Sequence, residues 1–203
     1  YSKNKLSESS VHKDPVKQFE KWWKQAIKAA VYEVNAMTLA TASADGVPSA
    51  RIVLLKGVEK SGFSFFTNYN SYKGIQLAEN PKACLVFFWK ELERQVRITG
   101  LIQKLDDQAN DAYFSSRPAE SRIGAITSPQ SKVIKSRAWL DEQFKKKKKE
   151  FKGKQINRPD NWGGYLVKPV IIEFWQGRPN RLHDRLQYTI KKNGNWIIER
   201  LAP

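Results

Sequence analysis

The feature that most constrains this chain is a succession of short apolar segments, each bounded by turn-forming residues. The segment at residues 36–42 ends before Ala44-Asp45-Gly46, and the one at 63–67 follows Ser61-Gly62. Short apolar runs bounded by Gly, Asn, Asp and Ser are typical of β-strands joined by tight turns. Strands joined in this way pair antiparallel, because parallel strands need long crossovers. The sequence therefore predicts an antiparallel sheet.

Helices are expected between these strands, at positions marked by capping residues. Asp14 as N-cap and Pro15 at the first helical position begin a helix that continues to Ala30. Further helices are expected at residues 71–79, at 106–126 with a break at Arg117-Pro118, and at 136–152. The expected strands are residues 36–42, 48–55, 63–67, 83–89, 94–105, 165–167, 170–175, 184–191 and 196–201, the first three forming a meander.

Many short strands with a few helices predict an α+β, mainly β fold: a small antiparallel barrel with surrounding helices. Residues 1–13 are polar and are expected to form a flexible segment, and residues 14–203 a single domain. The single cysteine permits no disulfide within the chain, no apolar run is long enough to span a bilayer, and the first residues carry no signal region. We expect a cytoplasmic protein, with a targeting segment upstream of Tyr1 left open.

The charge of the chain favours an anionic ligand or partner. Net charge is +16, from 36 basic and 20 acidic residues. Part of this excess lies in the lysine run at 145–149, which is expected to be a solvated helix face. The sequence has no zinc-finger spacing, no RNA-recognition signature, no Cys/His cluster for a metal and no glycine-rich phosphate loop. Any phosphate must therefore be bound by side chains.

Four short segments contain residue types that bind anions or reacting groups. Hydroxyl groups and Arg117 at a helix break could wrap an anion, and Arg181, His183 and Arg185 crowd charge beside an aromatic strand. Each segment alone also has a structural explanation: a strand end in solvent, a helix cap, or a histidine without a catalytic role. The four segments are residues 51–56, 93–97, 113–121 with 130–131, and 173–185.

Taken together and in this order, the segments resemble the pyridoxamine 5'-phosphate oxidase family. The resemblance extends from about Asp14 to Pro203, and the last two motifs are highly specific in combination. The matching motifs are Arg51-Ile52-Val53-Leu54-Leu55-Lys56, Glu93-Arg94-Gln95-Val96, Ser116-Arg117-Pro118, Glu173-Phe174-Trp175-Gln176-Gly177, Arg181-Leu182-His183-Asp184-Arg185 and the end Glu199-Arg200-Leu201-Ala202-Pro203.

The resemblance implies a fold, a cofactor and an assembly. The family fold is an FMN-binding split β-barrel of the six-stranded type, and its members are homodimers with FMN at the subunit interface. Arg51 and Lys73 would bind the FMN phosphate, and Gln130-Ser131 would reach the flavin from the partner subunit. The full cofactor set implied is Arg51, Ile52, Val53, Leu54, Leu55, Lys56, Phe66, Thr67, Tyr72, Lys73, Gln95, Gln130, Ser131, Trp175 and Arg185.

The resemblance also implies the substrate and the reaction. Arg181 and His183, with Leu182 between them, would bracket the pyridine ring as the catalytic pair, and Tyr1 would belong to a segment that closes over the substrate. The phosphate of the substrate would be held by Lys56, Tyr113, Arg117 and Ser121. The implied reaction oxidises pyridoxamine or pyridoxine 5'-phosphate to pyridoxal 5'-phosphate. A hydride equivalent passes from the substrate C4' to flavin N5, and O2 is reduced to hydrogen peroxide. The amine substrate also releases ammonia, and no metal, nucleic acid or membrane is implied.

Two positions depart from the family pattern. Tyr72 stands where the family has an arginine that binds the FMN phosphate, and Phe66 stands where it has a tyrosine. Two other interpretations stay open: another split-barrel flavoprotein, such as a flavin reductase-like or haem-handling relative, and a non-catalytic basic module that binds nucleic acid. The Arg181-Leu182-His183 motif argues against the first, and a flavin absorption band in the purified protein would exclude the second.

Overall fold

A single antiparallel sheet forms the centre of the structure, which is a computed structural model describing residues 4–203. The strands are β1 (Ala36–Ala42), β2 (Pro48–Leu54), β3 (Gly57–Glu59), β4 (Gly62–Asn68), β5 (Lys82–Trp89), β6 (Arg94–Lys104), β7 (Trp162–Gln176), β8 (Asp184–Ile190) and β9 (Trp196–Leu201). Within the described residues they pair in the order β2-β1-β5-β6-β7-β4-β3, with β8 added to β7 and β9 to β8. Every pair is antiparallel, as the sequence predicted.

The connection from β2 to β3 explains why this sheet curls into a barrel. The two strands stand at opposite ends of the strand order, yet only Leu55 and Lys56 join them. The sheet must therefore curl until its edges approach, and the backbone N–H of Lys56 donates to the carbonyl of Ser64 in β4 at 2.9 Å. The expected meander of the first three strands is wrong, because β4 pairs with β3 and β7 and not with β2. The expected barrel is confirmed.

Strand β7 continues through a position where the sequence predicted an interruption. The strands expected at residues 165–167 and 170–175 are one strand, because pairing with β6 continues on both sides of Pro169. The register shifts between Thr99 and Gly100, and Gly100 lies opposite Pro169. A local irregularity of this kind accommodates proline, which has no N–H to donate to the neighbouring strand.

Helix α1 (Pro15–Lys28) covers one side of the barrel and completes its core. Asp14 caps it, accepting hydrogen bonds from the backbone N–H groups of Val16 and Lys17, as expected. Phe19 is fully buried, with its ring centroid 4.9 Å from that of Phe63 and 5.1 Å from that of Phe87. Aromatic rings in the core therefore join α1 to the inner face of the sheet.

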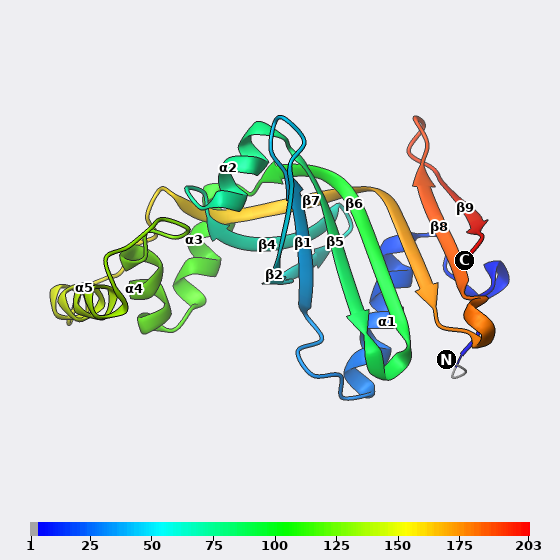
Figure 1. The fold of residues 1–203 in the computed structure, drawn as a ribbon, viewed down its shortest axis with the longest axis horizontal. Helices are drawn as coiled ribbons and strands as arrows, with labels where there is room; N and C mark the ends of the chain where they lie inside the picture. Colours follow the sequence, from blue (N-terminus) through cyan, green and yellow to red (C-terminus); the bar gives the residue numbers. More distant parts are fainter. Residues whose placement is uncertain (1–3) are drawn as a thin grey trace.

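The remaining helices are α2 (Tyr72–Glu79), α3 (Asp107–Ser116), α4 (Ala119–Thr127) and α5 (Arg137–Glu150). The break predicted at Arg117-Pro118 separates α3 from α4. In Figure 1, α3, α4 and α5 lie at one end of the long axis of the molecule, and β8 and β9 lie at the other end. A second, smaller core joins α3 and α4 to the start of β7, with Phe114, Ile123, Ile156 and Trp162 buried in it. No helix in residues 4–203 is long and apolar enough to cross a membrane.

The N-terminal segment lies against β8 and β9 in the part that the structure describes. Leu6 is buried, its backbone N–H donates to Asp184, and its carbonyl accepts from Arg200. Arg200 also pairs with Glu8 at 2.9 Å. The division into a flexible segment at 1–13 and one domain at 14–203 stays a prediction, and Tyr1 lies outside the described residues.

Candidate functional site

A cleft of about 400 Å³ lies where β2, β4, α3 and the start of β7 meet. Most of the residues expected to hold the cofactor phosphate and the substrate phosphate line it. Its lining consists of Arg51, Ile52, Val53, Leu54, Lys56, Phe66, Thr67, Asn68, Lys73, Tyr113, Arg117, Gln130 and Trp162. Four cations therefore face one cavity, and within residues 4–203 none of the four forms an ion pair with a carboxylate.

Hydrogen bonds to hydroxyl groups hold Arg51 on one side of the cleft. Its Nη1 donates to Thr41 Oγ1 at 2.6 Å and to the Leu39 carbonyl at 3.3 Å, and its Nη2 donates to Ser49 Oγ at 2.6 Å. Both hydroxyls donate in turn to Oε1 of Gln76, which is 1% exposed on α2. This network fixes the guanidinium between β1, β2 and α2.

Lys73 lies near Arg51 and shares its electrostatic environment. Its Nζ donates to Ser71 Oγ and to Gln130 Oε1, both at 3.4 Å. Burial lowers the pKa of Lys73, and the charge of Arg51 lowers it further. Burial also lowers the pKa of Arg51, although Tyr72 opposes that shift. Two partly buried like charges without a carboxylate are destabilising on their own and favourable to an anion between them.

Aromatic rings, and not acceptors, surround the second arginine of the cleft. The Arg117 guanidinium lies 4.8 Å from the Trp162 ring centroid and 5.6 Å from that of Phe114. Its Nη1 is buried without a hydrogen-bond partner, and burial lowers its pKa. Lys56 Nζ lies 5.9 Å from the Tyr113 ring centroid. Lys56, Tyr113 and Arg117, which are expected to hold the substrate phosphate, thus lie together near the C-terminal end of α3.

Other predicted residues do not line this cleft. Ser121 is exposed on α4, Tyr72 is 53% exposed on α2, and Leu55 belongs to the barrel core at 5% exposure. Ser131 is exposed and has a positive φ of 69°. Gln130, expected to reach the flavin of a partner subunit, lies beside Thr67 and Lys73 of its own chain. The contact of Gln130 with the flavin of a partner subunit stays a prediction.

A second group of predicted residues lies on the outer face of the sheet, where β6, β7 and β8 are paired. Gln95, Trp175 and Arg185 are successive register partners across the three strands. The His183 ring centroid lies 4.6 Å from that of Trp175, and His183 Nδ1 accepts a hydrogen bond from the backbone N–H of Arg178 at 3.1 Å.

Glu173 supports the arginine of this outer group. Glu173 is 5% exposed, and its carboxylate pairs with Arg185 Nε at 2.7 Å and with Arg97 Nη1 at 3.2 Å. Arg181 and Leu182 are exposed at the 3-10 turn η3 (Pro179–Arg181), where Arg181 has a positive φ of 61°. A non-glycine residue in this region carries backbone strain of the kind that accumulates at functional turns.

Sequence reasoning missed Trp162, which lines the cleft and stacks with two of its predicted residues. A signal for it does exist in Gly163-Gly164, which follow it directly. A Cβ on Gly163 would lie 2.1 Å from the Tyr69 hydroxyl, and one on Gly164 would lie 2.8 Å from the Phe66 ring. Two consecutive glycines that allow so close an approach mark the beginning of β7 as a packed junction.

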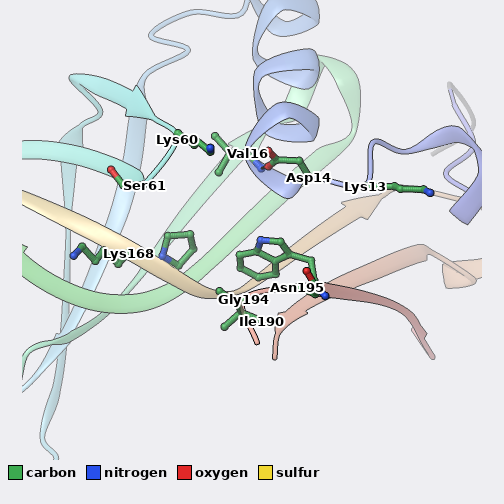
Figure 2. Close-up of a pocket in the computed structure, with 11 residues that line it drawn as sticks. Lys13, Asp14, Val16, Lys60, Ser61, Lys168, Ile190, Gly194 and Asn195 are labelled. Atoms are coloured by element: carbon green, nitrogen blue, oxygen red, sulfur yellow. Dashed lines mark hydrogen bonds between the residues drawn. The ribbon is translucent and has the colours of Figure 1, made fainter. Parts of the chain in front are cut away.

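A larger cavity of about 810 Å³ lies apart from these residues, between the start of α1, β7 and the β8–β9 hairpin. Figure 2 shows Lys13 and Lys168 there with their amino groups directed away from the cavity centre. The Asp14 carboxylate is already used as the cap of α1. None of the predicted site residues in the described part of the chain lines this cavity. The smaller cleft, where uncompensated cations converge, is the candidate site.

Two family profiles match this chain. Residues 23–147 match one described as pyridoxamine 5'-phosphate oxidase, and residues 162–203 match the pyridoxine 5'-phosphate oxidase C-terminal dimerisation region. The pyridoxine/pyridoxamine 5'-phosphate oxidases of Flavobacterium johnsoniae and Paraburkholderia phymatum are 52% and 56% identical over 203 residues, covering 100% of this chain and 95% of each relative.

Solved structures agree with this similarity. PhzG from Burkholderia lata 383, in complex with tetrahydrophenazine-1-carboxylic acid, has a TM-score of 0.93 at 29% identity, with 100% of both chains covered. A pyridoxamine 5'-phosphate oxidase-related, FMN binding protein from Nostoc punctiforme has a TM-score of 0.74 at 17% identity, covering 98% of this chain and 100% of its own. At that identity the second likeness shows the fold alone.

Proposed function

The chain belongs to the pyridoxamine 5'-phosphate oxidase family and is an oxidoreductase, and we propose that it oxidises pyridoxamine and pyridoxine 5'-phosphates to pyridoxal 5'-phosphate. The observation that carries this proposal is the cleft in which Arg117 keeps a buried, unpartnered Nη1 near three further uncompensated cations. Such a cleft suits phosphate groups, which offer several acceptor oxygens and compensate the charge.

The proposed reaction uses O2 as acceptor. Pyridoxamine 5'-phosphate, O2 and water give pyridoxal 5'-phosphate, ammonia and hydrogen peroxide, whereas the alcohol needs no water and releases no ammonia. FMN, when bound, would supply the two-electron acceptor next to the substrate C4'. The protein residues then have to bind two phosphorylated molecules and orient them relative to each other.

The residues present fit FMN. Arg51 and Lys73 are partly buried cations with lowered pKa values and no carboxylate, which is what a phosphate group would compensate. Ile52 to Leu54 of β2, with Phe66 and Thr67, would line the flavin and ribityl portions along the same cleft. The proposed cofactor set is completed by Leu55, Lys56 and Tyr72, by the outer-face residues Gln95, Trp175 and Arg185, and by Gln130 and Ser131.

The substrate would be held at both ends. Lys56, Tyr113, Arg117 and Ser121 would bind its phosphate, while Arg181, Leu182 and His183 would bracket its ring. Because His183 Nδ1 accepts from the Arg178 N–H, the neutral imidazole carries its proton on Nε2. The hydrogen bond from Arg178 and the contact with Trp175 would thus fix the orientation of the imidazole against the substrate ring.

We propose that the active site is shared between two copies of the chain. The cleft lies near α3, whereas η3 and β8 lie at the opposite end of the long axis in Figure 1. We infer that a twofold-related copy, and not the same chain, brings His183 to a substrate held by Arg117. Ile52 and Phe88, 66% and 54% exposed on the outer face of the sheet, would be covered in such a dimer. A cytoplasmic location stays a prediction.

An absorption spectrum tests the proposed function directly. Purified protein should show a flavin band that bleaches under anaerobic pyridoxamine 5'-phosphate and returns when air is admitted. A colourless protein that gains no oxidase activity with added FMN, and binds DNA in a salt-sensitive way, would contradict it in favour of the nucleic-acid interpretation.

Complementation tests the shared site. Arg117→Ala and Arg181→Ala chains should each have little activity alone. Co-expressed, they should recover about a quarter of wild-type activity, because half of randomly formed dimers are mixed and each mixed dimer has one intact site. Absence of recovery, despite mixed dimers shown by differential tags, would place both residues in a site within one chain.

A further inference from the structure

We propose that Trp162 is the positioning residue of the substrate-phosphate site: its ring holds the Arg117 guanidinium and the Tyr113 ring in place while leaving the charge of Arg117 uncompensated. This inference rests on the proposed function and adds to it a residue outside the predicted set. Trp162 is 6% exposed at the start of β7, and it acts through Arg117 and Tyr113.

Aromatic rings hold the guanidinium of Arg117. Within residues 4–203 its guanidinium forms no hydrogen bond and no ion pair, and its neighbours are the rings of Trp162 at 4.8 Å and Phe114 at 5.6 Å. A ring contacts the face of a guanidinium, whereas the five N–H donors of the group point outward in its own plane. With its Cζ over the Trp162 ring, the guanidinium of Arg117 is held by a contact that occupies none of its N–H donors.

The neutral ring of Trp162 leaves the positive charge of Arg117 uncompensated. A carboxylate could hold Arg117 equally well, but it would neutralise the cation and occupy its donors, and the phosphate would then have to displace it. A Trp ring attracts the cation through its quadrupole and carries no net charge. Trp162 thus orients the cation without competing with the substrate for it.

Trp162 also belongs to a stack of rings that includes Tyr113. The Phe66, Tyr113 and Trp162 rings are nearly parallel: Phe66 lies 3.9 Å from Tyr113 and 5.6 Å from Trp162, and the Tyr113 and Trp162 planes differ by 5°. These rings come from β4, α3 and β7. Phe66 is the nearer ring to Tyr113, and Trp162, 6.1 Å from Tyr113 between centroids, belongs to the same stack and also contacts Arg117.

Arg158 holds Trp162 in place relative to α3. Arg158 donates to the Trp162 carbonyl at 2.9 Å and pairs with Asp111 at 2.6 Å and with Asp107 at 2.7 Å, both on α3. The side chain of Arg158 is only 10% exposed. The start of β7 and the helix that carries Tyr113 and ends at Arg117 are thus tied together, so the ring and the residues it orients keep their mutual distance.

Two substitutions and one matched control test the role of Trp162 in the holoenzyme. Trp162→Leu removes the ring, and Trp162→Phe keeps a smaller face. Trp22 is the control, because it is also buried, at 3% exposure, and lies 4.4 Å from an arginine, Arg94, remote from the cleft. The measurements are steady-state kinetics with pyridoxamine and its 5'-phosphate, equilibrium binding of pyridoxal 5'-phosphate, flavin content and Tm.

Trp162→Leu should raise the KM for pyridoxamine 5'-phosphate and the Kd for pyridoxal 5'-phosphate by about 2- to 30-fold, the range of a cation–π contact. Its kcat and its kinetics with unphosphorylated pyridoxamine should change little, and Trp162→Phe should fall between it and wild type. In an Arg117→Ala background, Trp162→Leu should have almost no further effect on the KM of the phosphorylated substrate. Trp22→Leu should lower Tm without changing the ratio between the two substrates.

Equal losses on both substrates, or the same pattern in Trp22→Leu, would overturn the positioning role and leave Trp162 a core residue. Failure of the proposed function appears elsewhere, as wild-type protein that does not oxidise pyridoxamine 5'-phosphate. In that case the Kd for pyridoxal 5'-phosphate still decides the matter: unchanged or absent binding in wild type and Trp162→Leu alike contradicts the inference, and a raised Kd supports it.

Discussion

Arg51 and Arg117 are both partly buried arginines of one cleft, and burial lowers the pKa of each, yet they are held in opposite ways. Arg51 donates to Thr41, Ser49 and Leu39, so hydrogen bonds fix both its position and its rotation. Arg117 has ring neighbours and no acceptor among the described residues. Arg51 thus uses N–H donors in hydrogen bonds to the protein, whereas the guanidinium of Arg117 donates none of its own to the described residues.

The difference suits the two ligands that we propose. A cofactor remains bound through many turnovers, and a cation locked by directional hydrogen bonds can hold its phosphate in one place. A substrate must enter and leave in each cycle, and a guanidinium held by rings has no protein acceptor that competes with each new phosphate. This contrast leads to different expectations for substitutions at and beside the two arginines.

Removing the ring-held arginine should affect only the phosphorylated substrate. Arg117→Ala should lower kcat/KM for pyridoxamine 5'-phosphate by about 10- to 150-fold, corresponding to the loss of a charge-assisted contact of about 1.5–3 kcal/mol. Pyridoxamine itself has no group at this position, so its kcat/KM should barely move, and flavin content should equal that of wild type. A helix-end role for Arg117 would instead lower both rates together, with a lower Tm.

Exchanging each arginine for lysine should separate charge from hydrogen bonding. Arg51→Lys keeps the charge but loses the forked contacts to Thr41 and Ser49, each worth about 1 kcal/mol, so Tm should fall by about 2–8 °C and FMN should bind about tenfold more weakly. Arg117→Lys has no protein hydrogen bond to lose, so its Tm should stay close to wild type. Calorimetry and flavin fluorescence give both quantities, and equal Tm losses would remove the distinction.

The fold could be predicted from the sequence wherever local pattern decides it. Strand β1 and the break at Arg117-Pro118 lie where the alternation of residues and the proline place them. The pairing of β4 with β7 could not be predicted, because Phe65 and Tyr165 lie far apart in the chain and no local pattern encodes their contact. The three residues of β3 are too few to show any periodicity.

The site was predictable to a different degree. Family resemblance named Arg51, Lys73 and Arg117, and the structure brings them to one cleft. The contacts that hold these residues could not be predicted from the sequence. Gln76 accepts from hydroxyls on two strands, and Trp162 stacks with rings from two other elements. Such contacts depend on tertiary packing and leave no periodic signal in the sequence.

Adding a third cation beside the hydrogen-bonded arginine should strengthen cofactor binding modestly. Tyr72 is 53% exposed where the family pattern has arginine, so Tyr72→Arg would offer the FMN phosphate another contact. Because the new charge is exposed and adjoins Arg51 and Lys73, the gain in FMN affinity should be only about two- to tenfold. Tyr72→Phe is the matched control and should leave the affinity unchanged. Unchanged affinity in Tyr72→Arg would mean that another residue already makes this contact.

The pH dependence of FMN binding should reveal Lys73. Burial, and then the charge of Arg51, lower the pKa of Lys73 in the free protein. A bound phosphate favours the ammonium form and raises that pKa again, so binding takes up a proton once Lys73 has begun to deprotonate. The contribution of Lys73 to affinity should therefore be constant below its lowered pKa. It should decline as pH rises above that value, by at most about tenfold per pH unit.

Lys73→Arg keeps its charge throughout this range, while titration of the flavin and its phosphate is common to both proteins. The ratio of the two affinities should consequently be flat at low pH and should rise in favour of Lys73→Arg as pH increases. A ratio that stays constant over the whole range would show that Lys73 keeps its proton and that its burial does not tune cofactor binding.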